Sequence, residues 1–244
     1  MILTKDFPRE LQHQFEQTIV DNKFEAGESC TVDGLAEQFR ATTDQMLLVL
    51  QAAQRKGLVS KQKDGSFKFL ELAPPRDSVF SHTQKLGFKP TSEVREVKVE
   101  PASLQVAEKL SVEIGAPVYR FVRTRFVNGE ALANQTNFIP FEVCPGLEED
   151  DVSRYSFQKL LEEKYLAFTA DLKETFEVVP ANTQDQKILN LPEDSSVLLV
   201  QRISFSATGF PLVWSNIRIR PDRYQYVSKL WPSAAELVPE AQIE

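Results

Sequence analysis

The chain has 244 residues, of which 42% are hydrophobic and 26% are charged, so it can bury an ordinary core as one large domain or two smaller ones. Its formal net charge of −7 argues against indiscriminate binding to nucleic acid. No apolar run approaches the roughly 20 residues of a membrane-spanning helix, and the start lacks the apolar stretch of a signal peptide. Two cysteines without metal-ligand spacing, Cys30 and Cys144, favour a reducing cytoplasm and predict neither metal nor cofactor.

The first 72 residues have the pattern of three short helices followed by a hairpin. Apolar residues at helical spacing predict helices over 6–20, over 31–39, and from Thr42 or Thr43 to the helix-ending Gly57. Asp64-Gly65 is a turn signal between two short apolar segments, 58–60 and 67–69. This order predicts a winged helix-turn-helix, and the alternative is a small helical domain with an ordinary core.

Two prolines mark a boundary directly after this domain. Pro74 and Pro75 remove backbone donors and hold the chain extended, as in a stiff connector. We therefore expect a first domain over residues 1–72, a linker over 73–79 and a second domain over 80–244.

The second domain contains the same pattern twice, from Pro101 to Pro140 and from Pro180 to Pro221. Arg123 aligns with Arg202, and after one extra residue, Thr208, Leu132 aligns with Leu212. Each copy predicts a short helix and a β-hairpin. Two copies side by side predict one antiparallel sheet flanked by helices, with a cleft lined by equivalent positions.

The first hairpin places two arginines on one strand face. Between residues 118 and 127, alternation puts Arg123 and Arg125 beside Tyr119 and Phe121. Such a fork suits a phosphate, phosphonate or carboxylate, whereas the alternative is an exposed face whose arginines pair with nearby acids. On the second hairpin, Trp214 and Arg218 share a face with Asn216 and Arg220, although Arg220 can instead pair with Asp222.

The turn of the first hairpin leaves the partner of Arg123 open. A two-residue Asn128-Gly129 turn pairs Arg123 with Asn134. A three-residue loop with Gly129 in the left-handed conformation pairs Arg123 with Gln135 instead.

Both domains resemble a known family. The segments 35–39, 50–52 and 57–59 (LAEQF, LQA, GLV) resemble the winged-helix domain of GntR-family transcription regulators. The second domain resembles the effector-binding (UTRA) domain of the HutC subfamily, whose fold is similar to chorismate lyase, through the segments 86–90, 123–125, 137–140, 145–147, 160–162 and 218–223. The resemblance implies an α+β protein that joins a winged helix-turn-helix to an antiparallel-sheet α/β domain.

The resemblance also implies ligand-binding positions. Phe80 and Ser81 open the effector domain where an aromatic ring and a hydroxyl meet the ligand, and Ser156 matches a serine of the pocket. Gln135 stands where sugar-phosphate sensors have a glutamate, and a neutral amide cannot replace that charged acceptor. The predicted ligand-binding residues are Phe80, Ser81, Arg123, Arg125, Gln135, Ser156, Trp214 and Arg218.

The predicted DNA-binding residues are Thr42, Thr43 and Gln45 on the recognition helix, with Lys61 and Lys63 on the wing. The recognition helix departs from the family pattern, because Thr43, Asp44 and Gln45 stand where an arginine and two threonines are usual. Residues 1–72 hold nine Lys or Arg against eleven Asp or Glu, a net charge of −2, whereas a DNA-binding domain is normally basic.

These features leave three function classes. The first is a ligand-responsive regulator that binds double-stranded DNA as a homodimer and senses a small anionic metabolite. The second is a sensor that no longer binds DNA and acts through a protein partner. The third is a chorismate-lyase-like enzyme, which a shared fold alone does not support, and we expect no catalytic residues.

Overall fold

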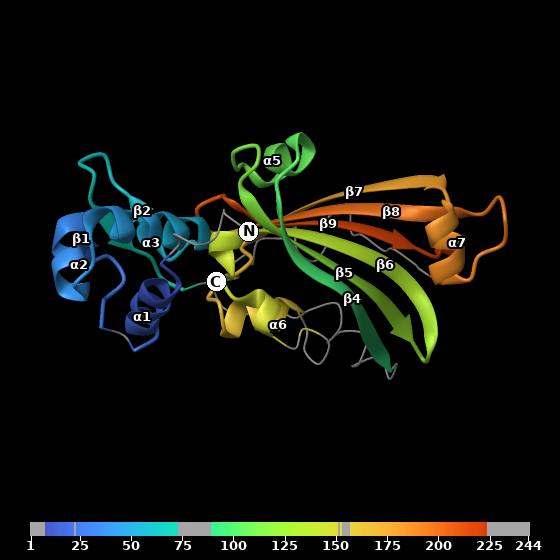
Figure 1. Ribbon diagram of the computed structural model, residues 1–244, viewed down its shortest axis with the longest axis horizontal. Coiled ribbons are helices and arrows are strands. Elements are labelled where there is room, and N and C mark those ends of the chain that lie inside the picture. Colours follow the sequence, from blue (N-terminus) through green and yellow to red (C-terminus); the bar gives the residue numbers. More distant parts are fainter. Residues whose placement is uncertain (1–7, 22, 73–88, 151, 153–156, 224–244) are drawn as a thin grey trace, which may run out of the picture.

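The computed structural model describes residues 8–21, 23–72, 89–150, 152 and 157–223 (Figure 1). The predicted linker and the candidate ligand residues Phe80, Ser81 and Ser156 lie outside these ranges. Among the described residues, the longest helix has 14 residues, and no helix combines the length and hydropathy needed to cross a membrane.

The N-terminal part is the predicted winged helix-turn-helix. Its elements are α1 (Arg9–Val20), β1 (Ser29–Cys30), α2 (Val32–Phe39), α3 (Thr43–Lys56), β2 (Val59–Lys61) and β3 (Phe67–Phe69). The side chain of Thr42 caps α3, and Gly57 ends the helix with a φ of 81° that favours glycine. The strands pair in the order β1-β3-β2, so the wing has a short third strand that the sequence pattern did not predict.

The remainder of the described chain is built on one six-stranded antiparallel sheet. Its strands are β4 (Pro90–Pro101), β5 (Pro117–Val127), β6 (Glu130–Pro140), β7 (Asp171–Pro180), β8 (Ser196–Phe205) and β9 (Pro211–Ile219). Their order is β4-β5-β6-β9-β8-β7. The order is symmetric about the β6–β9 pair, as expected if one unit occurs twice.

Each unit consists of a strand, a short helix and a hairpin. The helices are α5 (Leu104–Leu110) between β4 and β5, and α7 (Thr183–Leu189) between β7 and β8. The predicted helix-and-hairpin pairs are therefore present, and the outer strands β4 and β7 complete the two units. Leu132 and Leu212, which the sequence alignment equates, fall at matching register shifts of the two hairpins.

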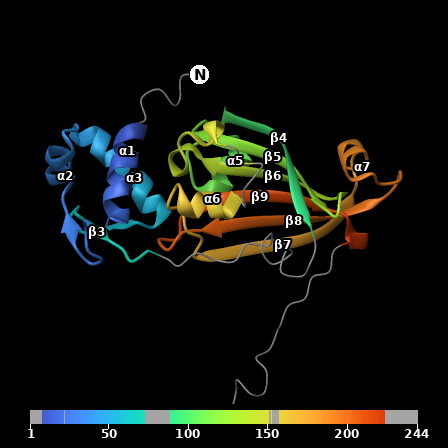
Figure 2. The same ribbon diagram turned by 90° about the horizontal axis from the view of Figure 1, so that it is seen from below.

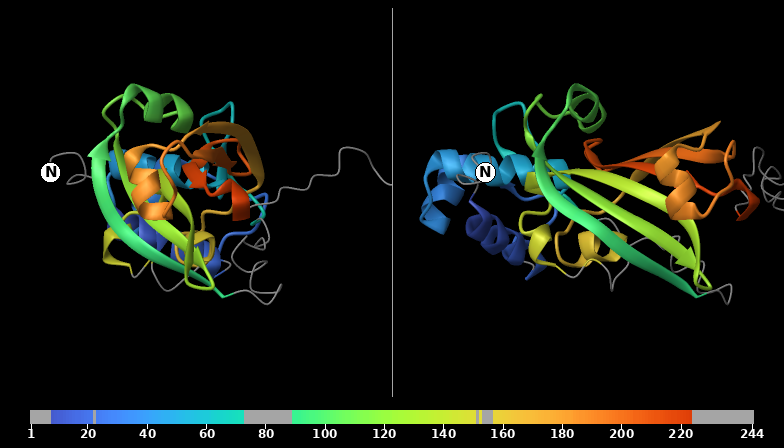
Figure 3. Two further views of the ribbon diagram at one scale, coloured as in Figure 1. Left: turned by 90° about the vertical axis from the view of Figure 1, so that its right-hand side faces the viewer. Right: turned by 45° about the vertical axis from the view of Figure 1, so that its right-hand side comes forward.

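The two faces of the sheet carry different helices (Figures 1 and 2). Alternation along the strands places Trp214 on the face covered by α5, in a cluster with Val106, Leu110 and Val118. The opposite face carries Tyr119 and packs against α6 (Phe157–Glu163) and the 3-10 turns η1 (Phe141–Val143) and η2 (Leu147–Glu149). We call this second face the α6 face; Figure 3 shows the curvature of the sheet.

The winged helix packs against the turns at one end of the sheet. Lys56, at the end of α3, is 1% exposed, and its Nζ donates to Glu16 Oε1 at 2.5 Å and to the carbonyl of Tyr165 at 2.6 Å. Arg55 forms an ion pair of 2.9 Å with Glu142. Arg55 and Lys56 therefore hold the two parts of the chain together.

We predict that Lys56→Ala destabilises the protein by about 3 to 5 kcal/mol, because it leaves the buried carboxylate of Glu16 without its cation. Lys61→Ala removes the same charge from an exposed position on β2 and should change stability by less than about 0.5 kcal/mol. Urea unfolding followed by circular dichroism measures both values. Equal effects of the two substitutions would show that the contact is not stabilising.

Candidate functional site

Two arginines of β5 converge on one neutral acceptor on the α6 face. Arg123 is 4% exposed and Arg125 is partly exposed. The Nε groups of Arg123 and Arg125 donate to the Oε1 atom of Gln135, at 3.2 Å and 2.9 Å. Among the described residues, no carboxylate forms an ion pair with either arginine. The pair therefore has hydrogen-bond partners but no neutralising charge there.

The pairing of Arg123 with Gln135 depends on a bulge and not on the length of the turn. Asn128 and Gly129 form a two-residue turn, with φ angles of 52° and 86°, between the paired residues Val127 and Glu130. A register shift follows: Phe126 pairs with Ala131, but Arg125 pairs with Ala133. The expectation that a two-residue turn pairs Arg123 with Asn134 is wrong, because the extra residue Leu132 moves the register by one position.

A chain of hydrogen bonds fixes the orientation of the Gln135 amide. Its Nε2 donates to Asn137 Oδ1 at 2.7 Å, and the same oxygen accepts from Ser215 Oγ at 2.7 Å. The Gln135 carbonyl oxygen must therefore point toward the arginines. A fixed neutral acceptor orients two guanidinium groups and leaves their charge uncompensated.

A third guanidinium belongs to the same face. Arg202 of β8 pairs in register with Ser215, which pairs with Asn137, so alternation along the strands puts Arg202 beside the Gln135 network. The Nε and Nη2 atoms of Arg202 contact Glu174 Oε1 at 2.7 Å and 2.6 Å. We refer to Arg123, Arg125 and Arg202 as the guanidinium cluster.

The three charges repel one another. Burial, followed by the charges of Arg125 and Arg202, lowers the pKa of Arg123. Burial and the charge of Arg202 lower the pKa of Arg125 to about 10. Both groups remain protonated at neutral pH, so the repulsion persists and an anion placed among them would relieve it.

Aromatic rings cover the buried end of the cluster. The guanidinium of Arg123 lies 5.4 Å from the ring centroid of Phe121 and 5.8 Å from that of Phe157 in α6. The two rings lie 5.0 Å apart. Contact with ring faces stabilises a cation and lowers the local dielectric, which strengthens its attraction for an anion.

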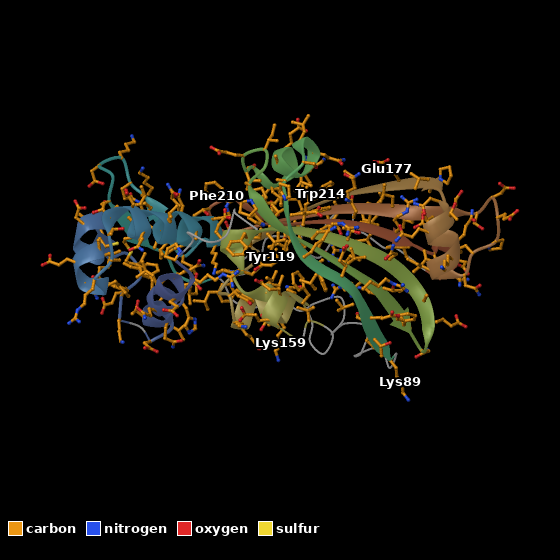
Figure 4. All side chains as sticks on the ribbon, in the orientation of Figure 1. Lys89, Tyr119, Lys159, Glu177, Phe210 and Trp214 are labelled. Carbon is orange, nitrogen blue, oxygen red and sulfur yellow. The ribbon has the colours of Figure 1, made fainter. Side chains whose placement is uncertain are left out.

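Trp214 and Arg218 do not belong to this cluster. Strand alternation puts Ile217 on the α6 face, so Trp214 and Arg218 point to the opposite face. Trp214, which is labelled in Figure 4, lies in the cluster beside α5. Its ring stacks on Phe138 with a centroid distance of 5.2 Å. Arg218 donates to Asp185 at 2.6 Å and to the carbonyl of Pro180 at 3.0 Å. The prediction that these two side chains join the arginine pair is therefore wrong.

The recognition helix begins with exposed side chains that are already engaged. Thr42 and Gln45 form a capping box: Thr42 Oγ1 accepts from the Gln45 backbone, and Gln45 Oε1 accepts from the Thr42 backbone at 3.1 Å. Thr43 Oγ1 donates to Asp33 at 3.0 Å. Lys61 and Lys63 are exposed on the wing. The helix start therefore presents polar groups beside two carboxylates, those of Asp33 and Asp44.

Glu148, in the turn η2 that follows β6, connects the sheet to the winged helix. Tyr119 stacks on Phe141 at 5.4 Å, and its hydroxyl donates to Glu148. Arg9 of α1 pairs with Glu148 at 3.0 Å and lies over the Phe141 ring at 4.9 Å. No local sequence pattern reveals this role of Glu148, because its partners Tyr119 and Arg9 lie 29 and 139 residues away in the chain.

Among the described residues, no group of three or more His, Cys, Asp or Glu side chains is placed to hold a metal ion. Cys144 is fully buried, and burial raises the pKa of its thiol. His82, the other half of the thiol–imidazole pair considered from the sequence, lies outside the described residues.

The UTRA domain family matches residues 85–225, which is more than half of the chain. The HTH-type transcriptional regulator GmuR of Bacillus subtilis (strain 168) is 26% identical over 202 residues, which cover 80% of this chain and 85% of GmuR.

Two solved structures share the fold at lower identity. PhnF from Mycobacterium smegmatis superposes with a TM-score of 0.60 at 16% identity, over 91% of this chain and 100% of that one. The regulator YydK from Bacillus subtilis superposes with a TM-score of 0.56 at 20% identity, over 91% of this chain and 97% of that one. With more than half of its length matched by the family, the chain belongs to the UTRA domain family.

Proposed function

We propose that this protein is a DNA-binding transcription regulator that responds to a small anionic metabolite bound at the guanidinium cluster. The observation that carries the proposal is the position of the cluster on the same sheet face as Tyr119, whose partners Phe141 and Glu148 contact Arg9 of the winged helix. GmuR carries the name of an HTH-type transcriptional regulator, and this supports a regulator over a chorismate-lyase-like enzyme.

The chemistry of the cluster favours an anion. Arg123 and Arg125 offer paired donors at the edge of a water-poor core, and Gln135 provides no competing negative charge. A phosphate, a phosphonate or a carboxylate satisfies such donors. An amino-sugar ligand is less suited, since Gln135 cannot supply a charged acceptor for an ammonium group.

A continuous set of contacts joins the cluster to the winged helix. Arg123 contacts the Phe121 ring; Tyr119, two residues along the same face of β5, contacts Phe141 and Glu148. Arg9 of α1 contacts the same two partners. An anion that repositions Arg123 can therefore change how α6 and the η1–η2 turns support the winged helix, which is the physical requirement for coupling two sites.

Binding to DNA would use the 1–72 domain in a homodimer. Lys61 and Lys63 would contact phosphates, and Thr42, Thr43 and Gln45 would face the major groove. The effector, bound within the 80–244 domain, would select one relative placement of the two winged helices and so change their fit to two half-sites.

A second candidate is a sensor that acts through a protein partner without contacting DNA. It is favoured by the engaged side chains at the start of α3, by the nearby Asp33 and Asp44, and by Leu48, which is 40% exposed on the same helix. Carboxylates at this position repel the DNA backbone.

We predict that the purified protein binds the promoter region of its own gene in a salt-dependent manner. The double substitution of Lys61 and Lys63 by Ala removes four phosphate contacts from a dimer, so it should weaken binding at least tenfold and reduce the slope of log K against log salt by about 4. Lys187 is exposed on α7 at the other end of the sheet, so Lys187→Ala should leave the affinity and the salt slope unchanged (Figure 1). Fluorescence anisotropy over a salt series measures these values. No binding at low salt would reject the first candidate and leave the second.

We also predict that anions stabilise the protein through Arg123. In a thermal-shift screen of phosphates, phosphonates and carboxylates, a ligand at 100 times its Kd should add about 2.7 kcal/mol. Arg123→Gln should abolish the shift. Arg120→Gln is the matched control, because Arg120 lies on the same strand, points to the opposite face and pairs with Glu96. Equal losses in both variants would contradict an anion site at Arg123.

A further inference from the structure

The internal repeat places Arg202 at the position equivalent to Arg123, but the two arginines have different partners. On the outer side of β5, Arg123 faces Val94 of β4. On the outer side of β8, Arg202 faces Glu174 of β7, and the two side chains form an ion pair. The same position of the repeat is therefore apolar in one half of the sheet and acidic in the other.

The difference divides the cluster into two parts. Arg123 and Arg125 share only the neutral oxygen of Gln135, whereas Arg202 carries its own counter-ion, Glu174, among the described residues. Three guanidinium groups and one carboxylate leave two positive charges in excess. The Arg202–Glu174 pair is partly accessible, with exposed side-chain fractions of 29% and 23%.

We propose that the ligand carries two separate anionic groups, one bound by Arg123 and Arg125 and the other by Arg202, where it replaces Glu174 as the counter-ion. This inference rests on the proposed function, since it specifies the ligand of the same site. Arg202 then determines specificity for two charged groups over one, and Glu174 occupies the second position when no ligand is bound.

The stretch of sheet between the two positions is buried and carries both polar and apolar side chains. β6 and β9 separate β5 from β8, so the backbones carrying the two positions lie about 14 Å apart along the sheet, at roughly 4.8 Å per strand. Asn137 and Ser215 provide polar atoms on this stretch, and Ile217 and Val200 provide apolar ones. The arginine side chains reach toward each other, so the two anionic groups lie closer together than the backbones do.

A ligand anion can replace Glu174 in its ion pair with Arg202. A pair that is about a quarter exposed is partly screened by solvent, so Glu174 contributes little net stability. A ligand anion tethered to a group already held at Arg123 and Arg125 reaches Arg202 at a high effective concentration. A ligand with a single charge lacks that advantage and would leave Glu174 in place.

The test uses linear alkane bisphosphonates with two to six methylene groups and ethylphosphonate as the single-charge-centre probe, in chelator-treated buffer. Isothermal titration calorimetry with the wild-type protein should give one chain length that binds at least tenfold more tightly than ethylphosphonate. Arg202→Gln should remove this advantage, so that the best bisphosphonate binds no more tightly than ethylphosphonate does to the same variant. Equal loss for both probes, or no bisphosphonate that binds more tightly than ethylphosphonate, would overturn the inference.

A second variant tests the displaced counter-ion. Glu174→Gln should tighten binding of the best bisphosphonate at least threefold, because no carboxylate then competes for Arg202. Glu177→Gln removes the same charge from the opposite face of β7 and should have no effect (Figure 4). Equal effects of the two substitutions, or none, would contradict displacement.

Two further variants separate the possible failures. If Arg202→Gln does not fold, the double variant Arg202→Gln/Glu174→Gln keeps an uncharged pair at both positions and carries the same expectation. If Arg123→Gln abolishes ethylphosphonate binding while Arg202→Gln affects neither probe, the proposed function stands and the two-anion ligand is rejected. If Arg123→Gln leaves ethylphosphonate binding unchanged, the proposed function itself fails.

Discussion

The central constraint is the repulsion among three arginines on one sheet face. Burying a charge without a partner costs several kcal/mol, and Arg123 is buried against two adjacent rings with a neutral amide as acceptor. The fold tolerates this cost because Asn137 and Ser215 fix the Gln135 amide, so the Nε groups of both arginines have an acceptor, although no described carboxylate neutralises their charge. A protein that only needed stability would place a carboxylate there; the uncompensated charge is the feature that makes an anion the natural complement.

Strand β5 also links the charge of Arg123 to the winged helix. Tyr119 lies on the same face as Arg123 and contacts Phe141 and Glu148, which also contact Arg9. At the end of α3, Lys56 and Arg55 also hold the winged helix against the rest of the chain, through the carbonyl of Tyr165 and the carboxylate of Glu142. From the sequence alone, these cations could contact a DNA backbone. In the structure they instead hold the winged helix against the rest of the chain. Residues 1–72 have a net charge of −2 from nine basic and eleven acidic residues, and the engagement of Arg9, Arg55 and Lys56 in these contacts leaves fewer cations for a DNA backbone.

The sequence predicted the elements well because their signals are local. The caps at Thr42 and Gly57, the Asp64-Gly65 turn and the aligned repeat gave three helices, a wing and two hairpins within a few residues of their positions. The sequence did not predict contacts between residues that lie far apart along the chain. The bulge at Leu132 changes the partner of Arg123. Trp214 and Arg218 share a face of β9, but only the pairing of β6 with β9 shows that this face lies opposite Arg123. The partners of Lys56, Arg202 and Glu148 belong to distant segments, which no local pattern reveals.

The repeat also differs between its halves on the opposite face of the sheet. Beside α5, the equivalent positions are apolar: Val106, Phe138, Ile203 and Trp214. Beside α7 the corresponding residues are Asp185, Arg218, Thr124 and Asn134, and Arg218 forms an ion pair with the fully buried Asp185. Buried ion pairs generally stabilise less than apolar packing of similar volume. On this face, polar residues therefore lie beside α7, at the end of the sheet away from the winged helix (Figure 1). Apolar packing is kept beside α5, where the carbonyls of Leu110 and Ser111 accept hydrogen bonds from Arg55 of α3. A loosened contact there would disturb the packing of the winged helix against the sheet.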